Sequence, residues 1–182
     1  MAKSKITSLG LDLSLTGTGV VALEDGEIII QRLIKSKPAG DLPVDELNRI
    51  RTIIRDIESC VIKATTIHVA VIEGLAFMVK NATALVQLSA LNYMVREMLF
   101  KHQIPFVIVA PTTLKKFVTG SGGSKKDVML MEMFKRYGVT ILDDNENDAF
   151  GLAKIGEELL SKNKDKLPVF QQEVLELLKK QI

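Results

Sequence analysis

The chain has 182 residues, of which 47% are hydrophobic and 25% charged, a composition that excludes disordered and fibrous proteins and suits one ordinary domain. Its 24 basic and 22 acidic residues give a formal charge of +2, which neither indicates nor excludes a nucleic-acid partner. The single Cys60 excludes an internal disulfide, and no apolar run is long enough to span a membrane. Because the first ten residues lack the apolar segment of a secretory signal, we expect a soluble cytoplasmic protein.

The first sixty residues predict three antiparallel strands followed by a helix. In the first strand, leucines alternate with Gly10, Asp12 and Ser14, which is the two-residue period of a strand. Asp25-Gly26 is typical of a tight hairpin turn between the second and third strands. A loop over 35–42 precedes five apolar residues spaced by three or four positions, the pattern of an amphipathic helix. The expected strands cover 6–15, 20–23 and 28–30, and the helix is defined by Leu47, Ile50, Ile54, Ile57 and Val61.

The middle of the chain predicts a buried strand and a helix of unusual composition. The apolar run 67–72 is typical of a buried strand, and it ends at Glu73. The following helix, over 82–100, carries only two charged residues, Arg96 and Glu97. We therefore expect one side of this helix to pack on the sheet and another side against a partner.

The last third of the chain predicts one more strand and several helices. Ser124 and Asp127 are interpreted as a capping box for a helix that ends at Gly138. The other expected elements are a strand over 106–109, a helix from Pro111, a flexible loop over 119–124, a helix opened by residues 143–148 and running to about 161, and a C-terminal helix marked by Phe170, Val174, Leu177 and Leu178. Together these elements imply an α/β fold, with a mixed sheet flanked by helices in one domain, a core over 6–160 and a helical extension over 161–182.

Three acidic residues stand out against this background. Asp12 lies in the middle of an apolar strand, where a buried carboxylate is costly unless it is paired or bound to a metal. Glu73 ends a buried strand, where open α/β sheets commonly place their sites. Asp148 lies in the first turns of a helix, where the helix dipole by itself favours an acid. Taken one at a time, each residue also fits a structural role.

Taken together, these acids indicate a metal site. A first-strand Asp, a strand-end Glu and a late helical Asp can converge at one edge of a sheet, and their mutual repulsion then requires cations. Hard oxygen ligands select Mg²⁺ or Mn²⁺, and paired ions of this kind cleave phosphodiesters. No competing zinc spacing exists, because His68 and His102 are isolated in the sequence.

Four short blocks surround these acids and occur in a fixed order over residues 6 to about 156. They read Gly10-Leu-Asp-Leu-Ser-Leu-Thr-Gly-Thr-Gly19-Val, Val71-Ile-Glu-Gly-Leu-Ala-Phe-Met-Val-Lys-Asn-Ala82, Gly120-Ser-Gly-Gly-Ser-Lys125-Lys-Asp-Val128 and Asp148-Ala-Phe-Gly-Leu-Ala153. In this order they resemble the RuvC family of Holliday junction resolvases, especially its phage-encoded members. Each block is weak alone, but four in order are specific.

The resemblance implies an RNase H-like fold with a five-stranded sheet, a homodimer, and metal-dependent nicking of four-way DNA junctions in the cytoplasm of a bacterium or a phage-infected host. It implies two Mg²⁺ ions per active site, with Mn²⁺ as a substitute. It carries catalytic roles to Asp12, Glu73 and Asp148, and a phosphate contact to Lys125. It also implies that Phe77 stacks on bases, and that DNA is bound by Lys80, Asn81, Lys125 and Lys126. Without the resemblance, Lys125 reads as a surface charge and Phe77 as a core aromatic.

The sequence departs from the family pattern in four places. The turn after Asp12 is two residues shorter and the Glu73 segment one residue longer, and residues after about 156 have no counterpart. The family's fourth acid usually precedes the last Asp by three positions, where this chain has Asn145. Because positions four apart share a helix face, we expect Asp144 to be the fourth metal ligand beside Asp148. Asn145 is the alternative, and Asp143 is expected to be a solvent-facing neighbour.

Other functions remain open from the sequence. A flap or branch nuclease of broader specificity would use the same acids, since fold does not fix substrate. An actin-like or sugar-kinase-like ATPase is suggested by Asp12 followed by Ser14, Thr16 and Gly17, but such proteins need two lobes, for which 182 residues without a repeat are too few. A non-catalytic junction binder is kept open by Asn145.

Overall fold

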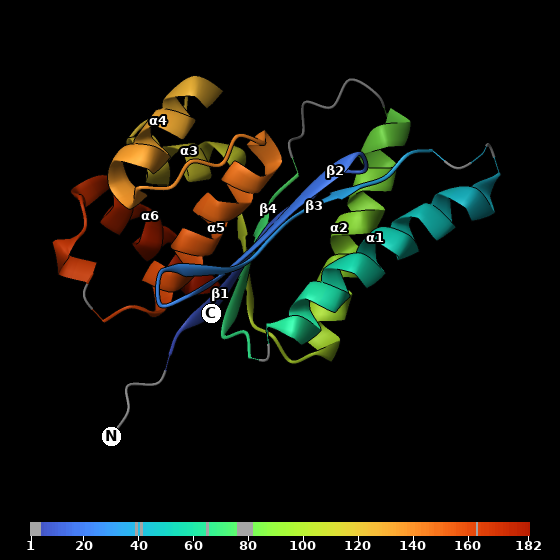
Figure 1. The fold of residues 1–182 in the computed structure, drawn as a ribbon, viewed down its shortest axis with the longest axis horizontal. Coiled ribbons are helices and arrows are strands. Elements are labelled where there is room, and N and C mark those ends of the chain that lie inside the picture. The colour runs from blue at the N-terminus through green and yellow to red at the C-terminus, as the bar shows by residue number, and fades with distance from the viewer. Residues whose placement is uncertain (1–4, 39, 41, 65, 76–81, 163) are drawn as a thin grey trace.

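The computed structural model describes residues 5–38, 40, 42–64, 66–75, 82–162 and 164–182. In it, helices cover both faces of a central sheet whose strand order is β3-β2-β1-β4-β5 (Figure 1). The strands are β1 (Thr7–Asp12), β2 (Gly17–Glu24), β3 (Glu27–Lys35), β4 (Val69–Glu73) and β5 (Phe106–Val109). The α-helices are α1 (Pro43–Lys63), α2 (Ala82–Lys101), α3 (Pro111–Thr119), α4 (Lys126–Tyr137), α5 (Asp144–Leu160) and α6 (Val169–Leu178), with 3₁₀ turns η1 (Lys164–Lys166) and η2 (Lys179–Gln181).

The sheet is mixed, as the sequence predicts. The hairpin of β2 and β3 turns at Asp25 and Gly26, whose φ angles of 48° and 91° suit the tight turn that an Asp-Gly pair favours. Strand β1 is antiparallel to β2 and parallel to β4, which is in turn parallel to β5. The carboxyl ends of β1 and β4 therefore lie at the same edge of the sheet, and they bring Asp12 and Glu73 to that edge.

Each face of the sheet has its own hydrophobic core. The leucines of β1 pack in a cluster with apolar residues of α1 and α2. The other face packs against α3, α4, α5 and α6 (Figure 1). The alternation predicted for the first strand is thus confirmed, with Leu9 and Leu11 on the α1–α2 side and Gly10 on the side of α5. Both faces of β1 are covered, so Asp12 lies in a buried strand.

Helix α5 lies unusually close to the sheet because two strand residues have no side chain. A Cβ on Gly10 would stand 1.9 Å from the carbonyl oxygen of Ala149, and one on Gly19 would stand 2.0 Å from that of Asn145. Real Cβ atoms do not approach backbone this closely, so only glycine permits the contact. The result is that the first two turns of α5 lie directly over β1 and β2.

The predicted capping box before α4 is wrong. The helix begins at Lys126, one residue later than the box requires, and Lys125 holds the cap position without a side-chain hydrogen bond. The Ser124 hydroxyl lies 2.7 Å from the Thr119 hydroxyl. This bond closes the glycine-rich loop on itself, and the competing local partner explains why Ser124 does not cap the helix. The predicted end of the helix at Gly138 is confirmed, with φ of 68°.

The predicted apolar face of α1 is wrong at one position, and the apolar residues of α6 divide between core and surface. Leu47 on α1 is 46% exposed, whereas Ile53 and Cys60 are buried, so the apolar face of α1 is rotated relative to the predicted one. Leu177 on α6 is exposed, and Leu175 takes its place in the core. In both helices, several apolar residues compete for one face, and packing on the sheet selects among them. No helix in the described ranges is long and apolar enough to cross a membrane.

Candidate active site

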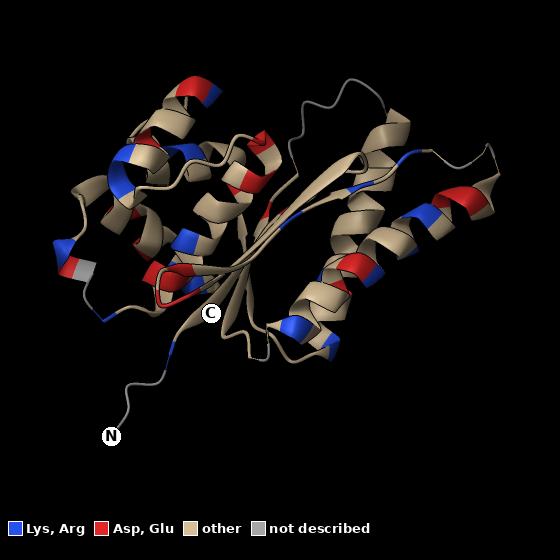
Figure 2. Cartoon of the chain, in the orientation of Figure 1, with Lys and Arg blue, Asp and Glu red and all other residues tan. Residues whose placement is uncertain are grey.

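Asp12, Glu73 and Asp148, here called the acidic edge, come from three different elements that meet at one end of the sheet. Asp12 is the last residue of β1 and Glu73 the last residue of β4. Asp148 follows one turn after the start of α5, on the helix that Gly10 and Gly19 allow to approach. Figure 2 shows the acidic colour at the start of α5, beside the ends of the strands. The structure thus brings together the three acids that the sequence singled out.

Burial sets the protonation of the acidic edge. It raises the pKa of Asp12, which is only 7% exposed, and burial together with the charge of Asp12 raises the pKa of Glu73 much further. The two side chains share a hydrogen bond that lowers the pKa of Asp12 and raises that of Glu73. Burial, followed by the charge of Asp12, raises the pKa of Asp148 to about 7. Without a cation, this site holds protons at a pH where ordinary carboxyl groups have lost them.

Two lysines supply positive charge to the acidic edge. Lys126, in the first turn of α4, lowers the pKa of both Asp12 and Asp148. Lys115 of α3 lowers the pKa of Glu73 and Asp148. Lys125, for which the sequence predicts a phosphate contact, is exposed at the cap of α4. Lys115 was not predicted from the sequence, although its place one turn into the helix that follows β5 points to the same edge of the sheet.

The start of α5 carries the residues that compete for the fourth ligand position. Asp143 is not a free solvent-facing neighbour, because its carboxylate accepts hydrogen bonds from the main-chain N–H groups of Asn145 and Glu146, at 3.0 and 3.2 Å. It is therefore the N-cap of the helix. Asp144 forms an ion pair of 2.6 Å with Lys126 and is 43% exposed. The side-chain nitrogen of Asn145 lies toward β2, 3.2 Å from where a Cβ of Gly17 would stand.

The acidic edge fits a hard divalent cation by its chemistry, since all its donor atoms are oxygens and burial penalises their uncompensated charge. Its side chains are not arranged as a closed ligand set, however. Within the residues that the structure describes, no three His, Cys, Asp or Glu side chains are grouped so that they could hold a metal ion. Asp12 and Glu73 hydrogen-bond to each other, and Asp148 interacts with them through charge alone.

A buried amide supports the end of β4. Asn92 of α2 is 1% exposed, and its side-chain nitrogen donates to the main-chain oxygen of Glu73 at 3.4 Å. Its side-chain oxygen has no hydrogen-bond partner in the described ranges. The predicted DNA-binding residues Phe77, Lys80 and Asn81 lie outside the residues that the structure describes.

Comparison with known proteins places the chain in a family. A family model described as crossover junction endodeoxyribonuclease RuvC matches residues 8–153. A structure of Thermus thermophilus RuvC in complex with Holliday junction substrate has a TM-score of 0.68 at 18% identity, and the match covers 81% of this chain and 90% of that one. The yeast mitochondrial Holliday junction resolvase matches with a TM-score of 0.60 at 12% identity, over 95% of this chain and 81% of that one. Curated protein sequences gave no match.

At these identities, the solved structures show the fold, which is the RNase H-like arrangement of a five-stranded mixed sheet between helices. The family match goes further, because it spans most of the chain and includes the whole acidic edge. Enzymes of this family depend on divalent metal ions and hydrolyse phosphodiester bonds of DNA. The chain therefore belongs to the RuvC family of crossover junction endodeoxyribonucleases and is a Holliday junction resolving endonuclease.

Proposed function

We propose that this endonuclease cuts DNA at the acidic edge, with Asp12, Glu73 and Asp148 as its catalytic carboxylates. The observation that carries the proposal is the convergence of three carboxylates at the shared end of β1, β4 and α5, where burial raises the pKa of each. Buried acids whose charge is uncompensated are the arrangement in which cation binding gains most. Structural ion pairs do not account for them, because Lys126 and Lys115 only partly offset their burial.

The proposed cofactor is Mg²⁺, with two ions per active site and Mn²⁺ as a substitute. Asp12, Glu73 and Asp148 would hold the ions, and Asp144 or Asn145 would supply the fourth ligand. Paired hard cations activate a water and stabilise the leaving oxygen of a phosphodiester. The chain's own contribution is to hold its carboxylates where β1, β4 and α5 meet, with α5 packed directly on the sheet at Gly10 and Gly19, and to keep Asp12 largely out of water.

The lysines around this edge are proposed to act on the DNA phosphates. Lys125 is assigned the contact at the scissile phosphate, and its exposed place at the end of the glycine-rich loop leaves it free to reach one. Lys126 is assigned to DNA binding, since it already compensates acidic charge at this site. Phe77, Lys80 and Asn81 are proposed to contact the opened junction.

We further propose that the active enzyme is a homodimer assembled through α2. Val86, Tyr93 and Phe100 are spaced by seven residues on this helix and are 66%, 65% and 76% exposed, so they form one apolar stripe. A two-fold dimer also suits a four-way junction that needs two opposed cuts.

Sedimentation of the Tyr93→Glu variant at micromolar concentration is expected to show monomers where the parent protein shows dimers. A monomeric parent, with and without DNA, would reject this assembly.

The decisive experiment compares DNA substrates. Labelled four-way junctions, flaps and linear duplexes of the same sequence are incubated with the protein, with and without Mg²⁺. Paired symmetric nicks in the four-way junction alone are expected. Equal cutting of flaps would instead support a branch nuclease of broader specificity, and the absence of any metal-dependent nick would reject the proposed site. Localisation to the cytoplasm of a bacterium or a phage-infected host is part of the same proposal.

A further inference from the structure

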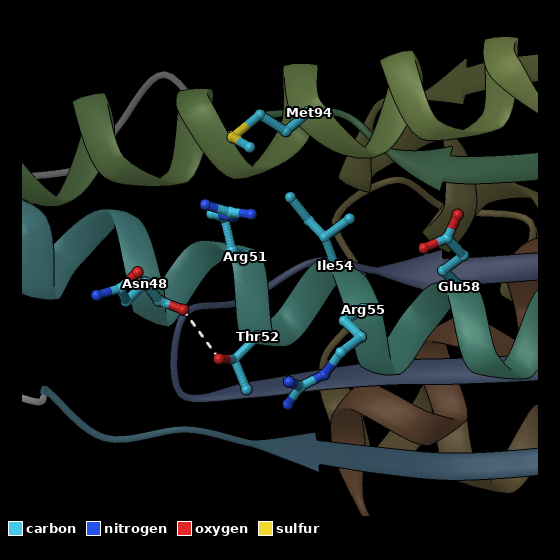
Figure 3. Close-up of a pocket in the computed structure, with 7 residues that line it drawn as sticks. All are labelled: Asn48, Arg51, Thr52, Ile54, Arg55, Glu58 and Met94. Carbon is cyan, nitrogen blue, oxygen red and sulfur yellow. Dashed lines mark hydrogen bonds between the residues drawn. The ribbon is translucent and has the colours of Figure 1, made fainter.

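A basic surface lies on the opposite side of the sheet from α5. Two adjoining hollows, of about 620 and 300 Å³, follow the outer face of α1 and share Asn48 and Thr52 in their walls. The larger lies between α1 and α2, and Figure 3 shows Arg51 and Ile54 rising from α1 toward Met94 of α2. The smaller extends to the end of β3 and the residues that follow it. We call the α1 basic surface the four exposed cations around these hollows, namely Lys35, Lys37, Arg51 and Arg55.

The charge of this surface is not neutralised by nearby acids. Its hollows are lined by one acid, Glu58, whose carboxylate lies 2.7 Å from the His102 ring. Arg55 has an exposed ion pair with its neighbour Asp56 at 3.9 Å, a contact that is weak in water. In the described part of the chain, Lys35, Lys37 and Arg51 form no ion pair. A concentration of free cations in a chain with a net charge of only +2 indicates an anionic partner.

Arg49, which also lines the smaller hollow, has a structural role. The guanidinium of Arg49 donates to the Ser36 hydroxyl at 2.9 Å and to the main-chain oxygen of Leu15. Ser36 donates to the same oxygen. These bonds join α1 to the loop that follows Asp12, so the α1 basic surface is fixed to the segment that leaves the acidic edge. Arg49 is thus a structural link and is not counted among the free cations.

Strand register places Lys35, at one end of this surface, beside the cutting edge. Asp12 pairs with Gly19, which pairs with Leu33 of β3, and Lys35 lies two residues further in the same direction. At about 3.3 Å per residue and 4.8 Å per strand, Lys35 is roughly 7 Å beyond the level of Asp12 and about 10 Å to its side. A duplex whose strand enters the acidic edge therefore has neighbouring DNA within reach of Lys35, at the near end of the α1 basic surface.

Resting on the proposed function, we propose that Lys35, Lys37, Arg51 and Arg55 bind the sugar–phosphate backbone of a junction arm adjacent to the strand being cut. The side chains are donors without acceptors, which suits phosphates. Arg51 and Arg55 lie on the outer helix α1, Lys35 ends the edge strand β3 and Lys37 follows it, whereas Gly10, in the strand that carries Asp12, faces α5. The surface therefore contributes affinity and orientation for a branched substrate, and takes no part in bond cleavage.

The test measures salt dependence of binding, without cleavage. Affinity of the full chain for an immobile four-way junction is followed by fluorescence anisotropy in EDTA over a series of salt concentrations. Arg51→Ala is expected to reduce the slope of log Kd against log salt by about one, and Lys35→Ala with Lys37→Ala by about two. Arg51→Lys should retain the parent slope. Lys63→Ala is the matched control, since it removes one exposed charge from the last turn of the same helix.

The outcomes separate this proposal from the proposed function. Slopes for Arg51→Ala and the paired lysine variant equal to that of Lys63→Ala would overturn the α1 basic surface, whatever the protein cuts. A parent protein that binds junctions with the expected slopes but never nicks them would instead reject the active site. In single turnover, the control variant Lys63→Ala is expected to nick the junction at the parent rate. If Arg51→Ala nicks more slowly at saturating protein with an unchanged salt slope, Arg51 belongs to the active site and the proposal is overturned.

Discussion

The main chain of Ala149 lies against Gly10 so closely that a Cβ on Gly10 would stand 1.9 Å from the Ala149 carbonyl oxygen and 2.5 Å from the nitrogen of Ala153. Ala149 follows Asp148, and Gly10 precedes Asp12 by two residues in the same strand. The contact between a helix and a strand without a side chain thus determines how near Asp148 comes to Asp12. One glycine links the packing of α5 to the geometry of the acidic edge.

Gly10→Ala is expected to destabilise the protein and to slow junction cleavage, because the added methyl must push α5 away from β1. Overpacking of this kind costs about 1–3 kcal/mol, and a chain of this size loses roughly 2–4 °C of Tm for each kcal/mol. Calorimetry and a single-turnover cleavage assay measure the two effects. Gly123→Ala is the control, since its Cβ would meet nothing closer than 4.0 Å. An unchanged Tm for Gly10→Ala would contradict the close packing of α5.

Sequence periodicity was enough to locate most elements and both sides of β1, because a strand buried on two faces still alternates its contacts. It did not predict which apolar residues of α1 and α6 face the core. Leu47 and Leu177 fit the helical period as well as their buried neighbours do, and only contact with the sheet distinguishes them. Strand order, likewise, depends on pairing between distant segments such as β1 and β4, which local patterns do not encode.

Asp12→Asn is expected to reduce junction cleavage by about 10³-fold or more while leaving junction affinity equal or higher. The Asp12 carboxylate is proposed to bind the metal ion, so its loss should remove catalysis. The loss of one negative charge should also reduce repulsion between the protein and the DNA phosphates. Cleavage and binding are measured on the same labelled junction, the latter in EDTA. Substantial residual cleavage by this variant would contradict the assignment of the acidic edge as the active site.

Stability without metal is expected to fall as the pH rises from about 5.5 to 8. The reason is that burial raises the pKa of Asp148 to about 7, so the folded protein keeps a proton that the unfolded chain releases near its usual pKa of 3.8. Asp12 and Glu73, with raised pKa values, act in the same direction. The Tm in EDTA should therefore drop over this range, and Mg²⁺ should raise it more at pH 8 than at pH 5.5. A weaker drop for Asp148→Asn is the internal control, and a Tm that rises with pH would contradict the burial of these acids.

The site itself was predictable only in part. Asp12, Glu73 and Asp148 could be selected because acids are out of place where a strand is apolar or a buried strand ends. The surrounding cations gave no such signal: Lys115 and Lys126 are ordinary lysines on helices, and only the fold brings them to the acids. Asp143 was misinterpreted for a related reason, since a capping carboxylate and a solvent-facing one look alike in the run of six acidic and amide residues over 143–148.

Lys125→Ala is expected to slow cleavage about 10-fold or more with little change in affinity, because a cation at the scissile phosphate stabilises charge that develops during the reaction. Lys126→Ala is the informative companion, since Lys126 already interacts with Asp12, Asp144 and Asp148. Single-turnover rates and salt-dependent affinities are compared for both variants. If Lys125→Ala changes only affinity and its salt slope, Lys125 is a backbone contact, and the catalytic cation is to be sought at Lys126.

The fourth ligand is the least constrained part of the site, and the structure supports both candidates by different contacts. Asp144 raises the pKa of Asp148, so its charge reaches the acidic edge, but its carboxylate is held by Lys126. Asn145 lies closer to the sheet, with its amide beside Gly17, and offers a neutral oxygen that binds divalent cations more weakly than a carboxylate.

We keep Asp144 as the predicted ligand because its ion pair with Lys126 is exposed and therefore weak, so a competing cation can replace it. Asp144→Asn should then raise the Mg²⁺ concentration needed for half-maximal cleavage by about 10-fold, while Asn145→Ala changes it little. Both variants are assayed on the four-way junction across a Mg²⁺ titration, with Lys126→Ala to test the ion pair. Freed from its lysine, Asp144 should bind the cation more readily, and the Lys126→Ala titration should shift to lower Mg²⁺. Loss of activity in Asn145→Ala alone would show that the family register holds at position 145 and that Asp144 only pairs with Lys126.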